Sequence, residues 1–358
     1  MNDPMAGTAP CPAGPPTAPA TGRAVIVADV GGTYARLAWT PLQPGTPPAI
    51  RDFRRYACAD HPSLAAILRG YAAALAADPA VPPAKSAVVA IAGLLEGDRL
   101  LNTNLAWPVS VEATRREAGL DALELINDFA AVAHAIPHAD PGTMSRLAGD
   151  GPHVHRWPAL VLGPGTGLGA ALRLEGGPRP VLPSEVGHSA LAPGNALELD
   201  ILRLLMRRHA HVDNERVLSG PGLVNLYDCL CELRGTTPCW RSPAELIEAA
   251  RQGGDALAAE SIHVFCGWLG SLVGDLAIAF GAKAVYLTGG ITGHIAGQLH
   301  DGHFLQRYLA KGALSQALRQ VPVWRVDHGQ LGVLGAAAWH AEGRSNAEAT
   351  DTGHGECR

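Results

Sequence analysis

The chain has 358 residues, of which 47% are hydrophobic, and its 28 Lys and Arg residues are outnumbered by 33 Asp and Glu residues, for a net charge of −5. The hydrophobic share is typical of a globular protein, and the length suggests about two domains. The mildly acidic balance argues against binding to nucleic acid or to an anionic membrane surface. No uninterrupted apolar run approaches the roughly 18 residues of a membrane span, so we expect no membrane association.

The cysteines indicate reduced thiols rather than a disulfide framework. There are seven of them, an odd number, spread from Cys11 to Cys357. The only close pair, Cys229 and Cys231, falls in a predicted helical stretch, where residues two apart do not face one site. We therefore expect a cytoplasmic protein without structural zinc.

The two ends differ in composition from the middle. Residues 1–22 are rich in Ala and Pro and almost free of charge, without the basic start or the apolar core of a signal peptide. Residues 342–358 are polar. Because neither segment has the apolar content to join a core, we expect a disordered extension at 1–22 and a flexible tail at 342–358.

The first part of the body alternates apolar runs with turns. Two apolar strands flank the turn Gly31–Thr33 and predict a hairpin. The strand that ends in Asn127–Asp128 leads directly into a helix. The expected elements are strands at 24–30, 34–39, 86–92 and 123–126 and helices at 64–77 and 129–136.

The same pattern then restarts. A second strand–turn–strand unit places Thr166 133 residues after Thr33, as a copy of the opening hairpin would. The expected elements are strands at 159–162, 168–174, 285–288 and 321–326 and helices at 196–209, 220–233, 243–250, 256–280 and 331–340. Repeated hairpins with helices between the later strands predict a duplicated α/β architecture with a cleft between its halves.

Two loops rich in Gly and Thr follow apolar strands. One is Gly31–Thr33, just after Asp29, and the other is Gly163–Gly169 with Thr166 in its middle. Glycines let a backbone expose its N–H groups to a phosphate, a Thr hydroxyl adds a donor, and an Asp can hold the water shell of Mg²⁺. A nucleotide held from both sides of a cleft is one interpretation, and two ordinary hairpin turns are the other. Neither loop matches a Walker or Rossmann motif.

Two further groups of residues, each at the end of a strand, are candidates for a site. Gly289–Gly290 follows a strand and suits packing against a flat adenosine. Asp128 stands at the carboxyl end of a strand, where ligands bind in α/β sheets, and there it could take the proton of an attacking hydroxyl. As an alternative, it caps the following helix.

Polar side chains suited to sugar hydroxyls occur in two more segments. They are Glu185 and His188 in one and Glu215 in the other. The alternatives are a structural histidine for His188 and a surface charge beside Arg216 for Glu215.

Together these motifs resemble the bacterial ATP-dependent glucokinase family, in the hexokinase/actin-like ATPase group. The resemblance extends from about Ala24 to Trp339 in the expected order. Its pieces are Asp29–Arg36, Ala92–Gly93, Gly97–Asp98, Asn102–Trp107, Leu125–Val132, Gly163–Gly169, Glu185–His188, Glu215–Leu223, Asn225–Tyr227, Gly289–Ile291, Lys311–Gly312 and Leu331–Ala336. Asn127–Phe129 and Glu215–Leu223 are the specific ones. The family commonly has Glu-Gly-Gly-His, and Val186 replaces the first of these glycines, which bears on the backbone shape before His188.

The resemblance implies a two-domain, duplicated hexokinase/actin-like (RNase H-like) fold with an interdomain cleft. The small domain would comprise 23–138 and 331–341, and the large domain 139–330. Asp128 would be the catalytic base, and Asn127, Asp128, Glu185, His188 and Glu215 would hold the sugar. The ATP-binding residues would be Ala28, Asp29, Val30, Gly31, Gly32, Thr33, Gly165, Thr166, Gly167, Gly289 and Gly290. Asp29 would hold Mg²⁺, partly through water.

The activity implied by the resemblance is transfer of a phosphoryl group from Mg-ATP to O6 of D-glucose, giving glucose 6-phosphate for glycolysis. The family also implies a homodimer. Another hexose kinase, for fructose, mannose or an amino sugar, is the alternative within enzymes. A sugar-sensing regulator on the same fold is the alternative from another class. A DNA-binding form of it would need a basic helix-turn-helix, which residues 1–22 do not provide.

Overall fold

The computed structural model describes residues 23–352 except 43–46, 102–104, 106, 153–154, 178–179 and 328, with side chains up to residue 343. The predicted extension at 1–22 lies outside the described residues, as do residues 353–358 of the predicted tail and Asn102–Asn104 of the family motif.

The described elements alternate between strands and helices along the chain. The strands are β1 (Ala24–Val30), β2 (Tyr34–Pro41), β3 (Arg51–Ala57), β4 (Ala84–Ile91), β5 (Leu94–Glu96), β6 (Arg99–Leu101), β7 (Val109–Ser110), β8 (Ala122–Asn127), β9 (Met144–Ala148), β10 (Ala159–Pro164), β11 (Leu168–Arg173), β12 (Val181–Ser184), β13 (Ala284–Leu287) and β14 (Val323–Val326). The helices are α1 (Leu64–Ala76), α2 (Val111–Ala118), α3 (Asp128–Ala135), α4 (Ala196–Arg208), α5 (Gly220–Arg234), α6 (Pro243–Arg251), α7 (Ala256–Ala279), α8 (Gly290–His294), α9 (Ala296–His300), α10 (His303–Leu309), α11 (Ser315–Leu318) and α12 (Leu331–Thr352).

Two larger sheets have the same plan. The first has the order β3-β2-β1-β4-β8 and the second β12-β11-β10-β13-β14-β9. In each, an antiparallel hairpin (β1–β2 or β10–β11) is followed by two parallel strands (β4 and β8, or β13 and β14). The predicted duplicated α/β architecture is confirmed.

The central strand of each sheet is buried on both faces, which explains its unbroken apolar sequence. In β1, Ile26 and Ala28 pack with α1 and α2, while Val25 and Val27 face α12. In β10, Leu160 and Leu162 face the large helical core that includes α5 and α7, and Val161 faces α3. Side chains alternate across a strand, so each sheet has a core on both sides.

Helix α7 belongs to the core of the second sheet. It is long and apolar enough to cross a membrane by length and composition, but 67% of its most apolar stretch is buried inside the molecule. It packs against α5, α6 and α10. The structure thus uses this apolar helix as a core element.

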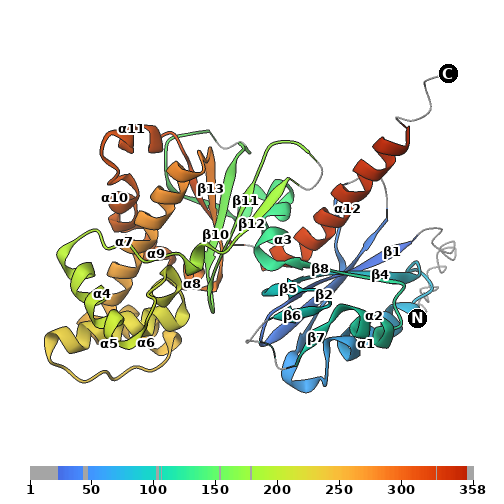
Figure 1. Cartoon of the computed structure of the whole chain (residues 1–358), viewed down its shortest axis with the longest axis horizontal. Coiled ribbons are helices and arrows are strands. Elements are labelled where there is room, and N and C mark those ends of the chain that lie inside the picture. Colours follow the sequence, from blue (N-terminus) through green and yellow to red (C-terminus); the bar gives the residue numbers. More distant parts are fainter. Residues whose placement is uncertain are drawn as a thin grey trace, which may run out of the picture.

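Helices α3 and α12 lie where the two sheet bodies meet (Figure 1). They cross so closely that a Cβ added to Gly335 would lie 1.7 Å from the carbonyl oxygen of Ala131. Ala133 and Ala135 of α3 pack with the second sheet, while Val333 and Ala337 of α12 pack with the first. The crossing therefore joins the two cores without bulky side chains between the helices.

The predicted end of the last helix is wrong. Helix α12 continues past His340 to Thr352, so the segment predicted as a tail from Glu342 begins as helix. The Glu342 carboxylate lies 2.8 Å from Nδ1 of His134 on α3 and 3.0 Å from Nη2 of Arg173 on β11. Although burial opposes ionisation, these two partners lower the pKa of Glu342. The polar composition of this segment gave no sign that Glu342 links α12 to α3 and to β11 of the second sheet.

Several exposed or short elements were not predicted. β3 reads Arg-Asp-Phe-Arg-Arg-Tyr-Ala and is exposed over most of its length at the edge of the first sheet. The strands of the three-stranded sheet β5-β6-β7 and the helices α8 to α11 are short. Such segments lack the long apolar periodicity on which sequence prediction depends.

We predict that Glu342→Ala lowers the free energy of unfolding by about 1–3 kcal/mol, because it leaves His134 and Arg173 without their shared carboxylate. Denaturant unfolding measures the change. Glu248→Ala, which removes an exposed ion pair with Arg251, is the control and should change stability by less than about 0.5 kcal/mol. Equal effects of the two substitutions would show that Glu342 is an ordinary surface charge.

Candidate active site

Asp128 is the first residue of α3, directly after β8. The N-cap of the helix is Asn127, whose Oδ1 accepts a hydrogen bond from the Ala130 N–H at 2.9 Å. Oδ1 of Asp128 accepts from the Phe129 N–H at 2.9 Å. The capping alternative therefore applies to Asn127, and Asp128 keeps its second carboxylate oxygen for chemistry.

The surroundings of Asp128 favour a proton acceptor near neutral pH. Burial raises the pKa of Asp128 to about 6, against the hydrogen bond from the Phe129 N–H, and the carboxylates of Asp29 and Glu185 raise it further. These two carboxylates come from β1 and from the segment after β12. Three of the predicted site residues thus share one electrostatic environment, although they are far apart in the sequence.

Asp29, on β1, lies in contact with the first turn of α12. A Cβ added to Gly332, in the first turn of α12, would lie 2.6 Å from Cγ of Asp29. Burial raises the pKa of Asp29, and the nearby Arg36 guanidinium opposes that shift. Nη1 of Arg36 lies 3.2 Å from Oδ2 of Asp29. A helix N-terminus also favours an anion, so the carboxylate is supported from two sides.

Arg36 is a site residue that the sequence analysis did not assign. It is paired with Asp29 across the β1–β2 hairpin. The register of the predicted hairpin was a signal that could have found it, because the turn Gly31–Thr33 places residue 36 opposite residue 29. Arg36 supplies a cation beside a cluster of carboxylates.

The first Gly/Thr loop is held from behind by Cys58. The Cys58 N–H donates to the Thr33 carbonyl at 2.9 Å, and its thiol donates to the Gly31 carbonyl at 3.4 Å. Burial raises the pKa of Cys58, which keeps the thiol protonated as a donor. Within the described residues, the N–H groups of Gly32 and Thr33 have no protein partner. The loop is fixed by its carbonyls and has N–H groups free for a ligand.

The glycines of the second loop serve different purposes. A Cβ on Gly169 would lie 1.9 Å from the Phe129 ring, and one on Gly163 would lie 2.8 Å from it. A Cβ on Gly167 would lie 2.5 Å from Oε2 of Glu215, whereas Gly165 has nothing within 4 Å. Gly163 and Gly169 therefore accommodate Phe129, and Gly165 borders open space next to the exposed Thr166.

The third glycine pair lies beside the second loop. Gly289 has a φ of +94°, and a Cβ on it would lie 2.4 Å from the carbonyl oxygen of Pro164. Gly290 begins α8 and has open space around its Cα. The structure therefore brings the predicted adenosine and phosphate segments of the second sheet together.

The predicted sugar residues are joined by hydrogen bonds between two short helical turns, 186–188 and 214–216. The Asn214 side-chain amide donates to the carbonyls of Val186 and Ser189. Glu215 is half-buried, and its Oε2 accepts from the Leu168 N–H at 2.9 Å. Glu215 is thus bonded to the second Gly/Thr loop rather than standing free as a surface charge, and it links that loop to the turn 214–216.

The Val186 substitution does not distort this turn. Among the described non-glycine residues, Asp52 alone has a positive φ, so Val186 has an ordinary backbone conformation. A side chain is compatible with this position, and that of Val186 packs against the large core.

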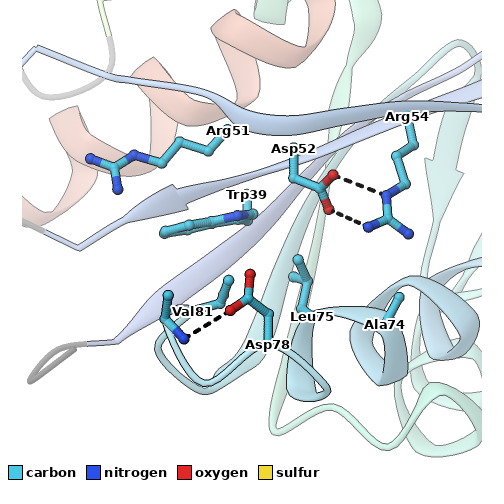
Figure 2. A pocket seen from close by; sticks show the side chains of 9 residues that line it. Trp39, Arg51, Asp52, Arg54, Ala74, Leu75, Asp78 and Val81 are labelled. Carbon is cyan, nitrogen blue, oxygen red and sulfur yellow. Dashed lines mark hydrogen bonds and ion pairs between the residues drawn. The ribbon is translucent and has the colours of Figure 1, made fainter. Parts of the chain in front are cut away.

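A separate pocket of about 300 Å³ lies at the far end of β2 (Figure 2). The Arg51 guanidinium stands 5.3 Å from the Trp39 ring, and Asp52 pairs with Arg54 at 2.8 Å. Its lining residues are Trp39, Arg51, Asp52, Arg54, Ala74, Leu75, Asp78, Ala80 and Val81. None of the predicted site residues belongs to this pocket.

Comparison with known proteins agrees with the resemblance. A family model described as Glucokinase matches residues 26–343. A glucokinase-like protein of Xylella fastidiosa (strain Temecula1) is 41% identical over 320 residues, which cover 88% of this chain and 94% of that protein. A glucokinase of Stenotrophomonas maltophilia (strain K279a) is 37% identical over 334 residues, which cover 92% and 98%.

Solved structures show the same fold. The crystal structure of a glucokinase from an Antarctic psychrotroph has a TM-score of 0.75 and 34% identity, and the match covers 88% of this chain and 98% of that one. A ROK family transcriptional regulator has a TM-score of 0.62 at 15% identity, covering 92% and 82%. Because an enzyme and a regulator share this fold, the fold alone does not separate the two functions.

We predict that Gly169→Ala lowers the melting temperature, because the new methyl group would overlap the Phe129 ring, and overpacking of this kind costs about 1–3 kcal/mol. The matched control is Gly165→Ala in the same loop, which has open space and should melt at the wild-type temperature or slightly above it. Calorimetry or thermal circular dichroism on both variants measures the difference. The interpretation is wrong if Gly169→Ala is as stable as Gly165→Ala.

Proposed function

The chain belongs to the glucokinase family, and we propose that it transfers the γ-phosphoryl group of ATP to the 6-hydroxyl of D-glucose. The observation that carries the proposal is Asp128, a carboxylate with a pKa raised to about 6. It lies in one electrostatic environment with Asp29, beside the first Gly/Thr loop, and with Glu185, of the sugar residues. A base between a phosphate-binding loop and a sugar-binding turn is what phosphorylation of a hydroxyl requires.

Asp128 would accept the proton of the 6-hydroxyl as that oxygen attacks the γ-phosphorus. Its hydrogen bond from the Phe129 N–H fixes one carboxylate oxygen. The other oxygen would face the hydroxyl. The Phe129 ring, seated on Gly163 and Gly169, holds the carboxylate at a constant distance from the second loop. Positioning of this kind contributes much of the catalysis in phosphoryl transfer, because the protein does little covalent chemistry.

The sugar would be bound by Asn127, Glu185, His188 and Glu215. Carboxylates accept hydrogen bonds from hydroxyl groups. Such a site, once closed over the sugar, penalises a sugar that lacks or inverts a hydroxyl, because a polar group that the closure buries then remains unpaired. Asn127 uses its Oδ1 to cap α3, so its side-chain N–H groups are the donors available to the sugar. Recognition of glucose in preference to fructose, mannose or an amino sugar is part of the proposal.

The phosphates would lie between the two Gly/Thr loops. The free N–H groups of Gly32 and Thr33 would donate to phosphate oxygens, and Gly165 and Thr166 would approach from the other sheet. Among the described residues, no group of three or more His, Cys, Asp or Glu side chains could hold a metal ion. A single carboxylate, Asp29, fits Mg²⁺ that arrives with the nucleotide and keeps most of its waters, and such an ion would neutralise phosphate charge.

Arg36 would add a second positive charge at the phosphates. It is partly exposed and lies beside Asp29. Its guanidinium can donate to phosphate oxygens while it opposes the rise that burial causes in the pKa of Asp29. Charge neutralisation near the transferred group is the main electrostatic requirement of the reaction.

We further propose that residues 23–138 with 331–341 and residues 139–330 act as two domains that close on the bound sugar, which would exclude water that otherwise hydrolyses ATP. The α3–α12 crossing at Gly335 is the contact about which they would move. We also propose a cytoplasmic homodimer that needs no structural zinc. The regulator alternative differs from the enzyme in one respect, since a sensor needs no catalytic base.

We predict that Asp128→Asn lowers kcat by about 10²–10⁴-fold while glucose binding changes little, because Asn can hydrogen-bond the hydroxyl but cannot take its proton. A coupled assay gives kcat, and calorimetry gives glucose affinity. The variant should be at least as stable as the wild type at pH 7, since ionising a carboxyl with a raised pKa costs stability. Near-normal turnover in this variant would remove Asp128 from the catalytic role.

We predict that kcat/KM for glucose falls about tenfold per pH unit below about pH 6. Only the ionised Asp128 can accept a proton, and its pKa of about 6 means that the ionised fraction declines below that value. Phosphorylation rates between pH 4.5 and 8 test this, with circular dichroism to show that the chain stays folded. The groups facing Asp128 are Asp29 and Glu185, and Arg36 acts on it through Asp29. A constant kcat/KM down to pH 5 in the folded protein would contradict the assignment.

A further inference from the structure

One ring nitrogen of His188 faces the buried carboxylate of Asp213, and the rest of the ring is exposed. His188 ends the turn 186–188, and its side chain is 60% exposed. Its Nδ1 lies 3.3 Å from Oδ2 of Asp213, whose side chain is only 12% exposed. The other ring nitrogen, Nε2, is therefore the atom available to a ligand.

Both oxygens of Asp213 have a defined partner. Oδ1 accepts a hydrogen bond from the Arg216 N–H at 3.0 Å and so caps the turn 214–216. Oδ2 faces His188. The position of Asp213 is fixed further by its backbone bridge to Ala190. The carboxylate cannot rotate away from His188 without losing the cap.

An ionised carboxylate can only accept hydrogen bonds, so Nδ1 of His188 must carry the hydrogen that is shared with Asp213. In the neutral imidazole the other nitrogen is then without a hydrogen and is an acceptor. We propose that Asp213 is a positioning residue that fixes this tautomer of His188, so that Nε2 accepts a hydrogen bond from a hydroxyl of the bound sugar. The inference rests on the proposed sugar site, and it assigns a polarity to one of its contacts.

The Asp213→Asn variant would exchange the donor and acceptor roles of the two His188 ring nitrogens without changing the fold. Asn is as favourable a cap as Asp, so its Oδ1 would still accept from the Arg216 N–H. Its Nδ2 would then face His188 as a donor. Nδ1 of His188 would have to accept, and Nε2 would carry the hydrogen. The site would present a donor where the wild type presents an acceptor.

The first measurement needs no ligand. Ring ¹⁵N chemical shifts in the neutral histidine, assigned by comparison with His188→Ala, report which nitrogen carries the hydrogen. We expect the Nδ1–H form in the wild type and the Nε2–H form in Asp213→Asn. The Nε2–H form in the wild type would overturn the proposal.

The second measurement uses glucose analogues in which one hydroxyl at C2, C3 or C4 is replaced by hydrogen or by fluorine. Fluorine can accept a weak hydrogen bond but cannot donate one. At the position that contacts His188, we expect the fluoro analogue to be as poor a substrate as the deoxy analogue for the wild type. For Asp213→Asn we expect kcat/KM for glucose to fall about tenfold, the ATP KM to stay unchanged, and the fluoro analogue to become better than the deoxy analogue.

Asp140→Asn is the matched control. Asp140 also caps a short helical turn, through a hydrogen bond from the Gly142 N–H, and among the described residues it forms no hydrogen bond or ion pair with a histidine. This variant should match the wild type in every measurement. A purely structural role of Asp213 would leave analogue preference unchanged in Asp213→Asn, and that result would overturn the proposal. Unchanged glucose kinetics in His188→Ala would instead overturn the sugar-site assignment on which it rests.

Discussion

The close packing of α3 against glycine on two sides is the constraint on which the site depends. The Phe129 ring occupies the space where Gly163 and Gly169 would have side chains, and the Ala131 carbonyl occupies that of Gly335. Each contact is too short for a Cβ. Since Asp128 precedes Phe129 on the same helix, the Phe129 contacts fix the carboxylate relative to the second sheet, and the Ala131 contact places it beside α12. Glycine at these positions is required by packing between elements, whereas Gly165 has open space around it.

The same constraint has an electrostatic consequence. Packing α3 between the sheets buries Asp128, and the strands and turns around it bring Asp29 and Glu185 near. Burial and like charge both oppose ionisation, so the pKa of Asp128 rises towards the range in which a base works best. Burial also raises the pKa of Asp29, and there the Arg36 guanidinium opposes the rise. The two carboxylates thus differ in their partners, because like charges act on Asp128 whereas a guanidinium lies beside Asp29.

The sequence predicted the parts of the fold whose apolar residues are regular. The hairpins, the parallel strands and the long helices could be located because β1 and β10 are buried on both faces and α7 is a core helix. The end of α12 could not be predicted, because the partners of Glu342 lie 169 and 208 residues away in the sequence. The site followed a similar rule. Its residue types were predictable from motifs, but only the structure shows that Asn127 is the cap that frees Asp128, and that Asp213 stands behind His188.

The two hairpins of the duplicated fold have diverged at equivalent positions. Counting from the loop, the second residue pair of β1–β2 is Asp29 with Arg36, and the second pair of β10–β11 is Gly163 with Gly169. The Asp29–Arg36 pair places a carboxylate and a guanidinium beside the first Gly/Thr loop. The Gly163–Gly169 pair has no side chains, which leaves room for the Phe129 ring. One copy of the hairpin thus carries an ion pair at this position, while the other leaves the space that Phe129 of α3 occupies.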